Sequence, residues 1–198
     1  SPLSPLLEGL LRRLMHVSAQ DHEASQTLSK QLNAVVLRIL SMSHGDDVYQ
    51  ALFSLLVSTT ADVAAGDQAQ LAELVVKCLW KVARKLPAAL EAKQVHAEAL
   101  LRSVEGFFEA IPPSEWAQRA QKHVPLRDIP LITATNVLKQ LTDTLGEGAL
   151  AATDAWTEPE KTHVYRYLLR LLHGPSPPPA ADAPSSPPPP APSPAPPA

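Results

Sequence analysis

The chain has 198 residues, of which 45% are hydrophobic, so one domain with a buried core can form. Its 17 basic and 20 acidic residues give a formal net charge of -3, which does not predict a binder of nucleic acid or of an anionic membrane. There is no run of about 18 apolar residues and no signal-peptide pattern at the start, so we expect a cytoplasmic protein. The single cysteine, Cys78, lies in an apolar periodic run, which predicts a buried side chain in a reducing compartment.

The composition changes after Gly174. From residue 175 to residue 198 the chain holds only Pro, Ala and Ser, apart from Asp182. Such a segment favours extended polyproline conformations and has almost nothing to bury. We therefore expect a helical domain over residues 1–174 and a disordered tail over 175–198. The tail would act as a spacer, or else as a ligand for a small aromatic-grooved domain.

Helical apolar periodicity, with Gly and Pro at the segment ends, predicts seven or eight helices and no strand. In chain order they cover about 5–19, 21–42, 48–65, 68–86, 91–110, 114–123, 130–145 and 158–173. Pro87 is expected to end the fourth helix, because proline cannot continue the backbone hydrogen bonds. Loops this short make successive helices antiparallel neighbours, so the fold class is all-α: an α-solenoid of HEAT-like repeats or an irregular bundle.

The apolar stripes and helix starts can be assigned to individual residues. The first helix is expected to bury Leu6, Leu7, Leu10, Leu11 and Leu14, and the second Leu28, Leu32, Val35, Val36, Ile39 and Leu40. The expected caps are Ser4 before Pro5, Asp46, Asp67, and a capping box formed by Thr157 and Glu160.

No catalytic or metal-binding pattern is found along the chain. The seven histidines include no HExxH pair, and a structural zinc site would need a second cysteine. Gly146 and Gly148 form a GxG typical of a helix-ending turn rather than a phosphate loop. Asp46 and Asp47 are better explained as the acidic start of a helix than as a carboxylate pair for catalysis. We expect no enzyme activity, cofactor, metal or small-molecule substrate.

One face of the predicted helix 68–86 is basic. At about 100° per residue, a narrow arc holds Lys77, Lys81, Arg84 and Lys85, and this arc is called the basic strip below. Trp80 lies at the border between the strip and the apolar side of the helix. Its ring can complete the core beneath a solvated strip, or it can present its edge to an acidic partner beside the cations.

The last predicted helix is apolar over about half of its circumference, which is wider than one-sided packing needs. Leu168 and Leu172 lie near the middle of the apolar arc and are expected to seat the helix. Val164, Tyr167 and Leu171 form its flank and are the candidates for exposed partner contacts, with Arg166 and Arg170 as a basic border. The alternative is a well-buried terminal helix.

Four segments appear in an informative order: LNAVVLRILSMSHGDDVYQALFSLL, LAELVVKCLWKVARKLP, VPLRDIPLITATNVLKQLTDTLGEG and YRYLLRLL. In order and spacing they resemble the C-terminal domain of the TOG-domain microtubule polymerases, the family of ch-TOG and Minispindles, over residues 28–172. The resemblance implies a piece of a long multi-TOG protein that lies downstream of the tubulin-binding array.

That resemblance implies docking rather than polymerisation. The domain would bind acidic coiled-coil adaptors of the TACC family and so bring the polymerase to centrosomes, spindle microtubules or microtubule plus ends. Ordinary TOG domains bind tubulin through loops along one edge, where a tryptophan is expected in the first turn. The turn at residues 43–47 has no tryptophan. Direct binding of tubulin is therefore the alternative expectation, and a helical scaffold or enzyme outside this family is a third.

Overall fold

The computed structural model describes residues 2–20, 23–61, 66–122 and 124–174. Within these ranges the chain forms ten α-helices and one short 3₁₀ helix, and no strand is present in them. The predicted disordered tail, 175–198, lies outside the described residues. The α-helices are α1 (Leu3–Ser18), α2 (Glu23–Met42), α3 (Gly45–Thr60), α4 (Asp67–Ala83), α5 (Leu86–Glu91), α6 (Ala97–Ala110), α7 (Pro113–Gln121), α8 (Ile129–Leu145), α9 (Gly148–Ala151) and α10 (His163–His173). The 3₁₀ helix η1 covers Pro159–Lys161.

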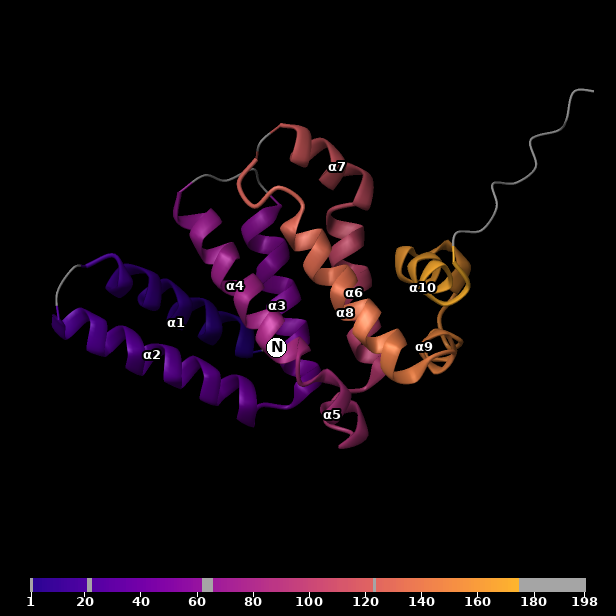
Figure 1. The fold of residues 1–198 in the computed structure, drawn as a ribbon, viewed down its shortest axis with the longest axis horizontal. Coiled ribbons are helices and arrows are strands. Elements are labelled where there is room, and N and C mark those ends of the chain that lie inside the picture. The colour runs from indigo at the N-terminus through magenta and orange to yellow at the C-terminus, as the bar shows by residue number, and fades with distance from the viewer. Residues whose placement is uncertain (1, 21–22, 62–65, 123, 175–198) are drawn as a thin grey trace, which may run out of the picture.

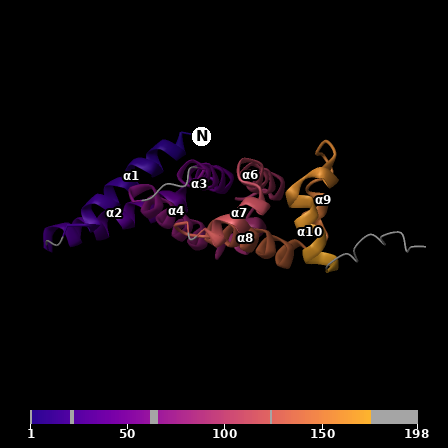
Figure 2. The same cartoon turned by 90° about the horizontal axis from the view of Figure 1, so that it is seen from above.

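The long helices lie in two rows. One row contains α1, α3 and α6, and the other contains α2, α4 and α8, so that successive pairs follow one another along the molecule (Figures 1 and 2). Neighbours pack within the rows, as α3 does on α6 and α4 on α8, and across them, as α3 does on α4. The last helix, α10, crosses the end of the array and packs on both α6 and α8. The described part of the chain therefore has an all-α fold, as expected. None of its helices is both long and apolar enough to span a bilayer.

The core contains an aromatic cluster. Phe107 of α6 lies next to three other aromatic rings. The distance between ring centroids is 6.1 Å to Phe53 of α3, 5.7 Å to its neighbour Phe108 on α6, and 5.7 Å to Trp116 of α7. Trp116 is 2% exposed. Arg119 lies over the Trp116 ring and donates hydrogen bonds to the carbonyls of Thr60 and Ala61, so α7 covers the C-terminal end of α3.

The fourth helix ends earlier than expected. It stops at Ala83, and Pro87 lies in the first turn of a separate short helix, α5. Proline fits there because the first turn leaves its backbone N–H groups unpaired. The expected fifth helix, 91–110, consequently begins only at Ala97. The very short α9 was not expected at all, whereas Gly146 ends α8 as the GxG interpretation predicted.

The predicted helix caps are wrong. Ser4 lies inside α1, and Asp67 is the first residue of α4 rather than its cap. The predicted box of Thr157 and Glu160 does not start α10. The capping residue there is Thr162, whose hydroxyl accepts a hydrogen bond from the Tyr165 N–H at 3.2 Å.

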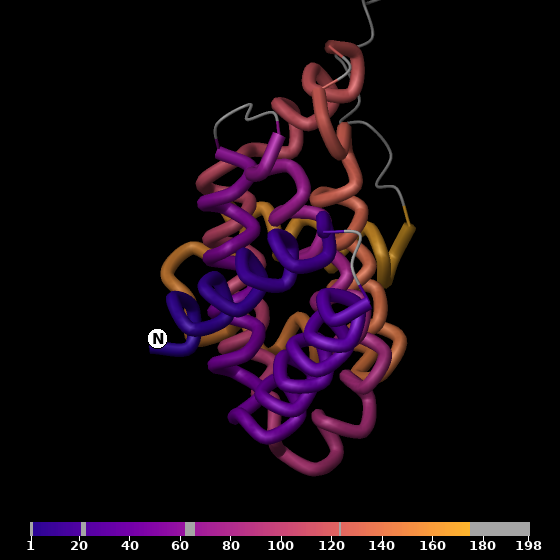
Figure 3. Tube along the Cα trace, turned by 90° about the vertical axis from the view of Figure 1, so that its left-hand side faces the viewer, coloured from indigo at the N-terminus to yellow at the C-terminus, as the bar shows by residue number. Residues whose placement is uncertain are grey.

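The second helix is far less buried than its periodicity predicted. Of its expected stripe only Val36 and Leu40 are buried, whereas Leu28 is 40% and Val35 47% exposed. The reason is position, because α2 lies at the outer end of its row and packs chiefly on α1 (Figure 3). Leu6 of α1, also expected inside, is 52% exposed.

Candidate partner-binding surface

The basic strip begins on the exposed face of α4 with Lys77 and Lys81 and continues into the turn after the helix, where Arg84 and Lys85 lie. All four of its side chains are exposed, while Val75, Val76 and Leu79 on the opposite side are buried. Lys77 is paired with Glu73 of the same helix at 2.7 Å. In the described part of the chain, Lys81, Arg84 and Lys85 have no carboxylate within ion-pair distance. The C-terminal end of the strip is therefore a source of uncompensated positive charge.

Trp80 is fixed at the border of the strip. Its indole Nε1–H donates to the Thr133 hydroxyl of α8 at 3.0 Å, yet 43% of the side chain remains exposed. Arg84 and Asp143 line the same shallow hollow between α4 and α8. Trp80 therefore joins α4 to α8 and still offers part of its ring to the surface.

A cavity that sequence analysis did not predict lies next to the strip. It has a volume of about 470 Å³ and is formed by the C-terminal half of α2, the start of α3, the end of α4, and α5 with the loop that follows it. The view in Figure 1 places these segments at one edge of the molecule. Its apolar walls include Leu37, Leu40, Val48, Val82, Ala89 and Val95. Arg38, Lys81 and Lys85 also line it, so it combines an apolar interior with basic side chains.

Tyr49 of α3 lines this cavity and is only 2% exposed. Its hydroxyl oxygen is buried and has no hydrogen-bond partner among the described residues. Burial raises the pKa of Tyr49, so the phenol stays protonated at neutral pH and can donate a hydrogen bond. Leaving a buried hydroxyl unpaired costs about 1–3 kcal/mol.

A close contact between two turns holds the cavity walls together. The Gly45 N–H at the start of α3 donates to the Gln94 carbonyl at 3.0 Å. A Cβ atom on Gly45 would lie 2.3 Å from Val95 Cγ2 and 2.6 Å from the Gln94 oxygen. Only glycine allows the backbones to approach this closely.

His44, Asp46 and His96 meet at the same contact, with potential ligand atoms all within 4.8 Å of one another. This is a donor set that zinc can use. However, Asp46 already accepts from the His96 backbone N–H at 2.8 Å and lies 2.7 Å from its Nδ1. We therefore interpret these three residues as a structural contact that joins the turn before α3 to the loop before α6. Asp46, which was predicted to cap α3, makes this contact instead. The sequence search missed it because the two histidines are distant in the chain.

The apolar flank of α10 is smaller than expected. Val164, predicted to be exposed, is completely buried, as is Leu168. Tyr167 stacks on Phe108 with ring centroids 6.1 Å apart, and only Leu171, at 39%, stays substantially exposed. The flank is buried because α10 lies across α6 and α8 rather than beside one helix.

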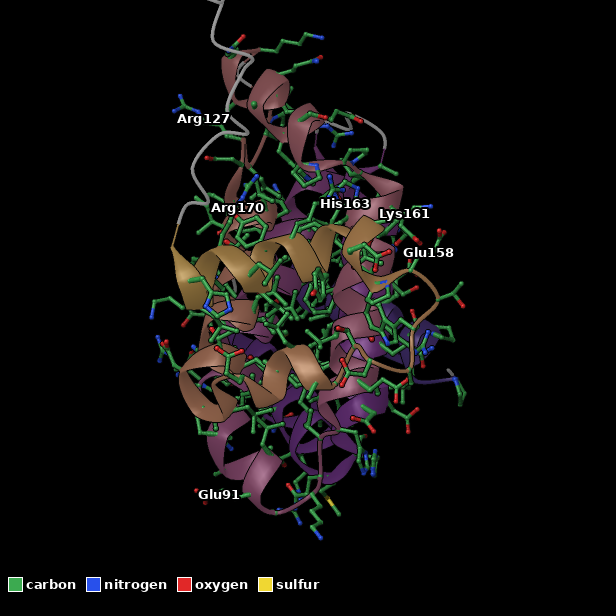
Figure 4. All side chains as sticks on the ribbon, turned by 90° about the vertical axis from the view of Figure 1, so that its right-hand side faces the viewer. Glu91, Arg127, Glu158, Lys161, His163 and Arg170 are labelled. Carbon is green, nitrogen blue, oxygen red and sulfur yellow. The ribbon has the colours of Figure 1, made fainter. Side chains whose placement is uncertain are left out.

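The two arginines of α10 differ. The guanidinium of Arg166 donates to the carbonyls of Thr162 and Lys161, so it serves the start of its own helix. Arg170 is exposed, as Figure 4 shows on the outer side of α10. The structure therefore leaves Leu171 and Arg170 as the accessible part of this candidate surface.

No protein-family model and no solved structure matches the chain.

Proposed function

We propose that this chain is a non-catalytic docking domain of a microtubule-associated polymerase, which binds an acidic coiled-coil adaptor of the TACC type. The adaptor would place the polymerase at centrosomes and spindle microtubules. The observation that carries the proposal is the uncompensated charge of Lys81, Arg84 and Lys85 beside the half-exposed Trp80. Cations without partners next to an aromatic edge and apolar walls suit an acidic helical surface.

The arrangement of the helices supports the same proposal. Antiparallel pairs that follow one another in two rows are what stacked HEAT-like repeats produce. The pairs α1 with α2, α3 with α4, and α6 with α8 fit a small TOG-like α-solenoid. The sequence resemblance to the C-terminal domain of the TOG-domain polymerases points in the same direction.

Direct binding of tubulin is the alternative function within the same family. The turn that joins α2 to α3 would hold the expected aromatic contact, but it contains His44 and Gly45. Trp80 lies between α4 and α8, and Trp116 is buried. The placement of these residues favours the adaptor over tubulin.

The test is a binding measurement with two purified candidates, a TACC-type coiled coil and tubulin dimers. We expect the coiled coil to bind, with an affinity that falls as salt rises. Replacing Lys81 and Arg84 by Glu should weaken binding about tenfold or more and flatten the salt dependence. Lys77→Glu is the matched control, because Lys77 is already neutralised by Glu73. Binding of tubulin instead would support the alternative, and binding of neither would refute both.

A further inference from the structure

Three side chains that can bind a metal lie at the contact between the turn before α3 and the loop before α6. His44 precedes α3, Asp46 lies in the first turn of that helix, and His96 precedes α6. Each residue offers one donor atom, and the three atoms lie within 4.8 Å of one another. No other group of three such side chains meets in the described part of the chain. Two imidazole nitrogens and a carboxylate oxygen are a ligand set that zinc uses in proteins.

The distances between the donor atoms suit a single ion. Asp46 Oδ2 lies 2.7 Å from His96 Nδ1 and 3.8 Å from His44 Nδ1. Zinc binds such atoms at about 2.0–2.2 Å, so two donors on a tetrahedral ion lie roughly 3.3 Å apart. The two distances in the structure lie on either side of this value. The imidazoles are 52% and 61% exposed, so small ring rotations can bring all three donors around one ion.

Backbone hydrogen bonds fix the carboxylate in the orientation that an ion needs. Asp46 Oδ1 accepts from the His96 N–H at 2.8 Å, and the other oxygen, Oδ2, is the one next to the imidazoles. The neighbouring Gly45 N–H donates to the Gln94 carbonyl at 3.0 Å. Each histidine carbonyl accepts a backbone hydrogen bond from the first turn of its own helix. Partners of this kind that orient the ligands raise metal affinity by about 10–100-fold.

The same atoms serve both the metal-free contact and a metal site. The tautomer of His96 with a proton on Nδ1 donates to Asp46 Oδ2 and so joins the two turns. The other tautomer carries its proton on Nε2 and leaves the lone pair of Nδ1 for an ion. Because the ring is largely exposed, water can accept the Nε2 proton. Metal binding therefore exchanges one hydrogen bond for coordination bonds and needs no rearrangement of the backbone.

We infer that His44, Asp46 and His96 bind one zinc ion, with water at the fourth position. Three protein ligands leave this position open, unlike the closed four-ligand sites of structural zinc. The ion joins segments that are 50 residues apart in the chain. Gly45 and Gln94 of the same contact line the cavity beside α4, so bound zinc stabilises one wall of that cavity. The inference does not rest on the proposed function, and its test needs no adaptor.

The experiment titrates zinc into the full chain, prepared without a histidine tag, and follows binding by calorimetry. We expect one ion per chain. Zinc at a hundred times the measured Kd should raise the melting temperature by about 5 °C or more, because it binds the folded state. His44→Ala and His96→Ala should each weaken binding by about tenfold or more. Magnesium should not compete, since it prefers oxygen ligands.

Asp46→Asn separates the metal site from the structural contact. Asparagine keeps an oxygen for the His96 N–H and places an amide group at the position of Oδ2, where it can donate to Nδ1 of the other tautomer. Without metal this variant should melt within about 2 °C of the wild type. With zinc its melting temperature should not rise, because the carboxylate ligand is gone.

His173→Ala is the matched control at a second pair of this kind. His173 lies 3.7 Å from Glu147, but among the described residues no third ligand joins them. Zinc affinity should therefore be unchanged in this variant. The melting temperature of every variant without metal checks that it is folded.

The outcomes decide the inference directly. Loss of zinc binding in all three ligand variants, with His173→Ala unaffected, would support it. Absence of binding up to about 1 mM zinc would overturn it and leave the three residues as a contact between turns alone. Equal affinity and equal thermal shifts in the wild type and Asp46→Asn would place the zinc elsewhere. Displacement of zinc by a modest excess of magnesium would show an oxygen site without the imidazoles, which also overturns the inference.

Discussion

Glu105 of α6 holds the start of α10. Its carboxylate accepts a hydrogen bond from the Val164 N–H at 2.7 Å and another from the His163 N–H at 3.0 Å, although Glu105 is only 7% exposed. The first backbone N–H groups of a helix have no partner within it, and a negative charge at that end is favourable. The buried carboxylate of one helix thus fixes where the last helix docks.

Replacing Glu105 by Ala should lower the free energy of unfolding by about 2 kcal/mol or more, because the buried N–H of Val164 and the part-buried N–H of His163 lose their acceptor. Urea denaturation gives this value, and hydrogen exchange should show that the amides of α10 lose protection first. Glu109→Ala, at an exposed position of the same helix, is the control and should change little. Equal losses in both variants would mean that the contact to α10 contributes nothing.

Gly45→Ala tests the close contact between the turn before α3 and the loop before α6. The added methyl group would meet Val95 and the Gln94 carbonyl, so stability should fall by about 1–3 kcal/mol. The control is Gly9→Ala inside α1, where no atom lies within 4 Å of the added carbon. That change should stabilise the protein by up to about 1 kcal/mol. Equal changes in melting temperature for Gly45→Ala and Gly9→Ala would show that the close approach at Gly45 does not affect stability.

Much of the fold could be predicted because helix periodicity is local. The long helix α8 was predicted to within one residue, and the buried and exposed sides of α4 were assigned correctly. The stripe of α2 was misjudged because periodicity shows which face is apolar, but not whether a neighbouring helix covers it. Leu28 and Val35 are exposed for this reason.

The candidate site could be predicted only in part. Lys81 and Lys85 were found because spacing placed them on one face of the predicted helix 68–86, although α4 ends at Ala83 and Lys85 lies in the turn after it. The cavity was missed because Arg38, Tyr49 and Val95 come from separate segments and meet only in the folded chain. The acceptor role of Glu105 was missed for the same reason, because its donors are more than fifty residues away. An unpaired buried hydroxyl leaves no sequence signal.

Leu168 and Leu171 should separate folding from binding on α10. Leu168 is completely buried, so Leu168→Ala should cost about 2–5 kcal/mol of stability. Leu171 is 39% exposed, and Leu171→Ala should cost less than about 1 kcal/mol. If α10 also touches the adaptor, Leu171→Ala will weaken binding with the fold intact. Tyr167 cannot serve as a second test of binding, because it stacks on Phe108 and its loss would weaken the core.

Cys78 gives a prediction about pH. Burial raises the pKa of its thiol from the ordinary value of 9.0 to about 11, although the nearby Lys81 acts in the opposite direction. Because the folded state holds this proton more tightly than the unfolded state, the thiol's contribution to stability is complete below about pH 9 and is lost as the pH rises toward 11. Urea denaturation gives the free energy of unfolding of the wild type and of Cys78→Ala at each pH across this range. The difference between the two proteins should shrink with rising pH, by about 2 kcal/mol in total. The measurements are best made in a Tyr49→Phe background, because burial also raises the pKa of Tyr49 and its phenol would add a second alkaline titration.

At pH 8 the thiol of folded Cys78 should react with an aromatic disulfide reagent far more slowly than the thiol of the unfolded protein, since only the thiolate attacks. A constant difference between the two stability curves, together with rapid labelling of the folded protein, would show that Cys78 is open to solvent.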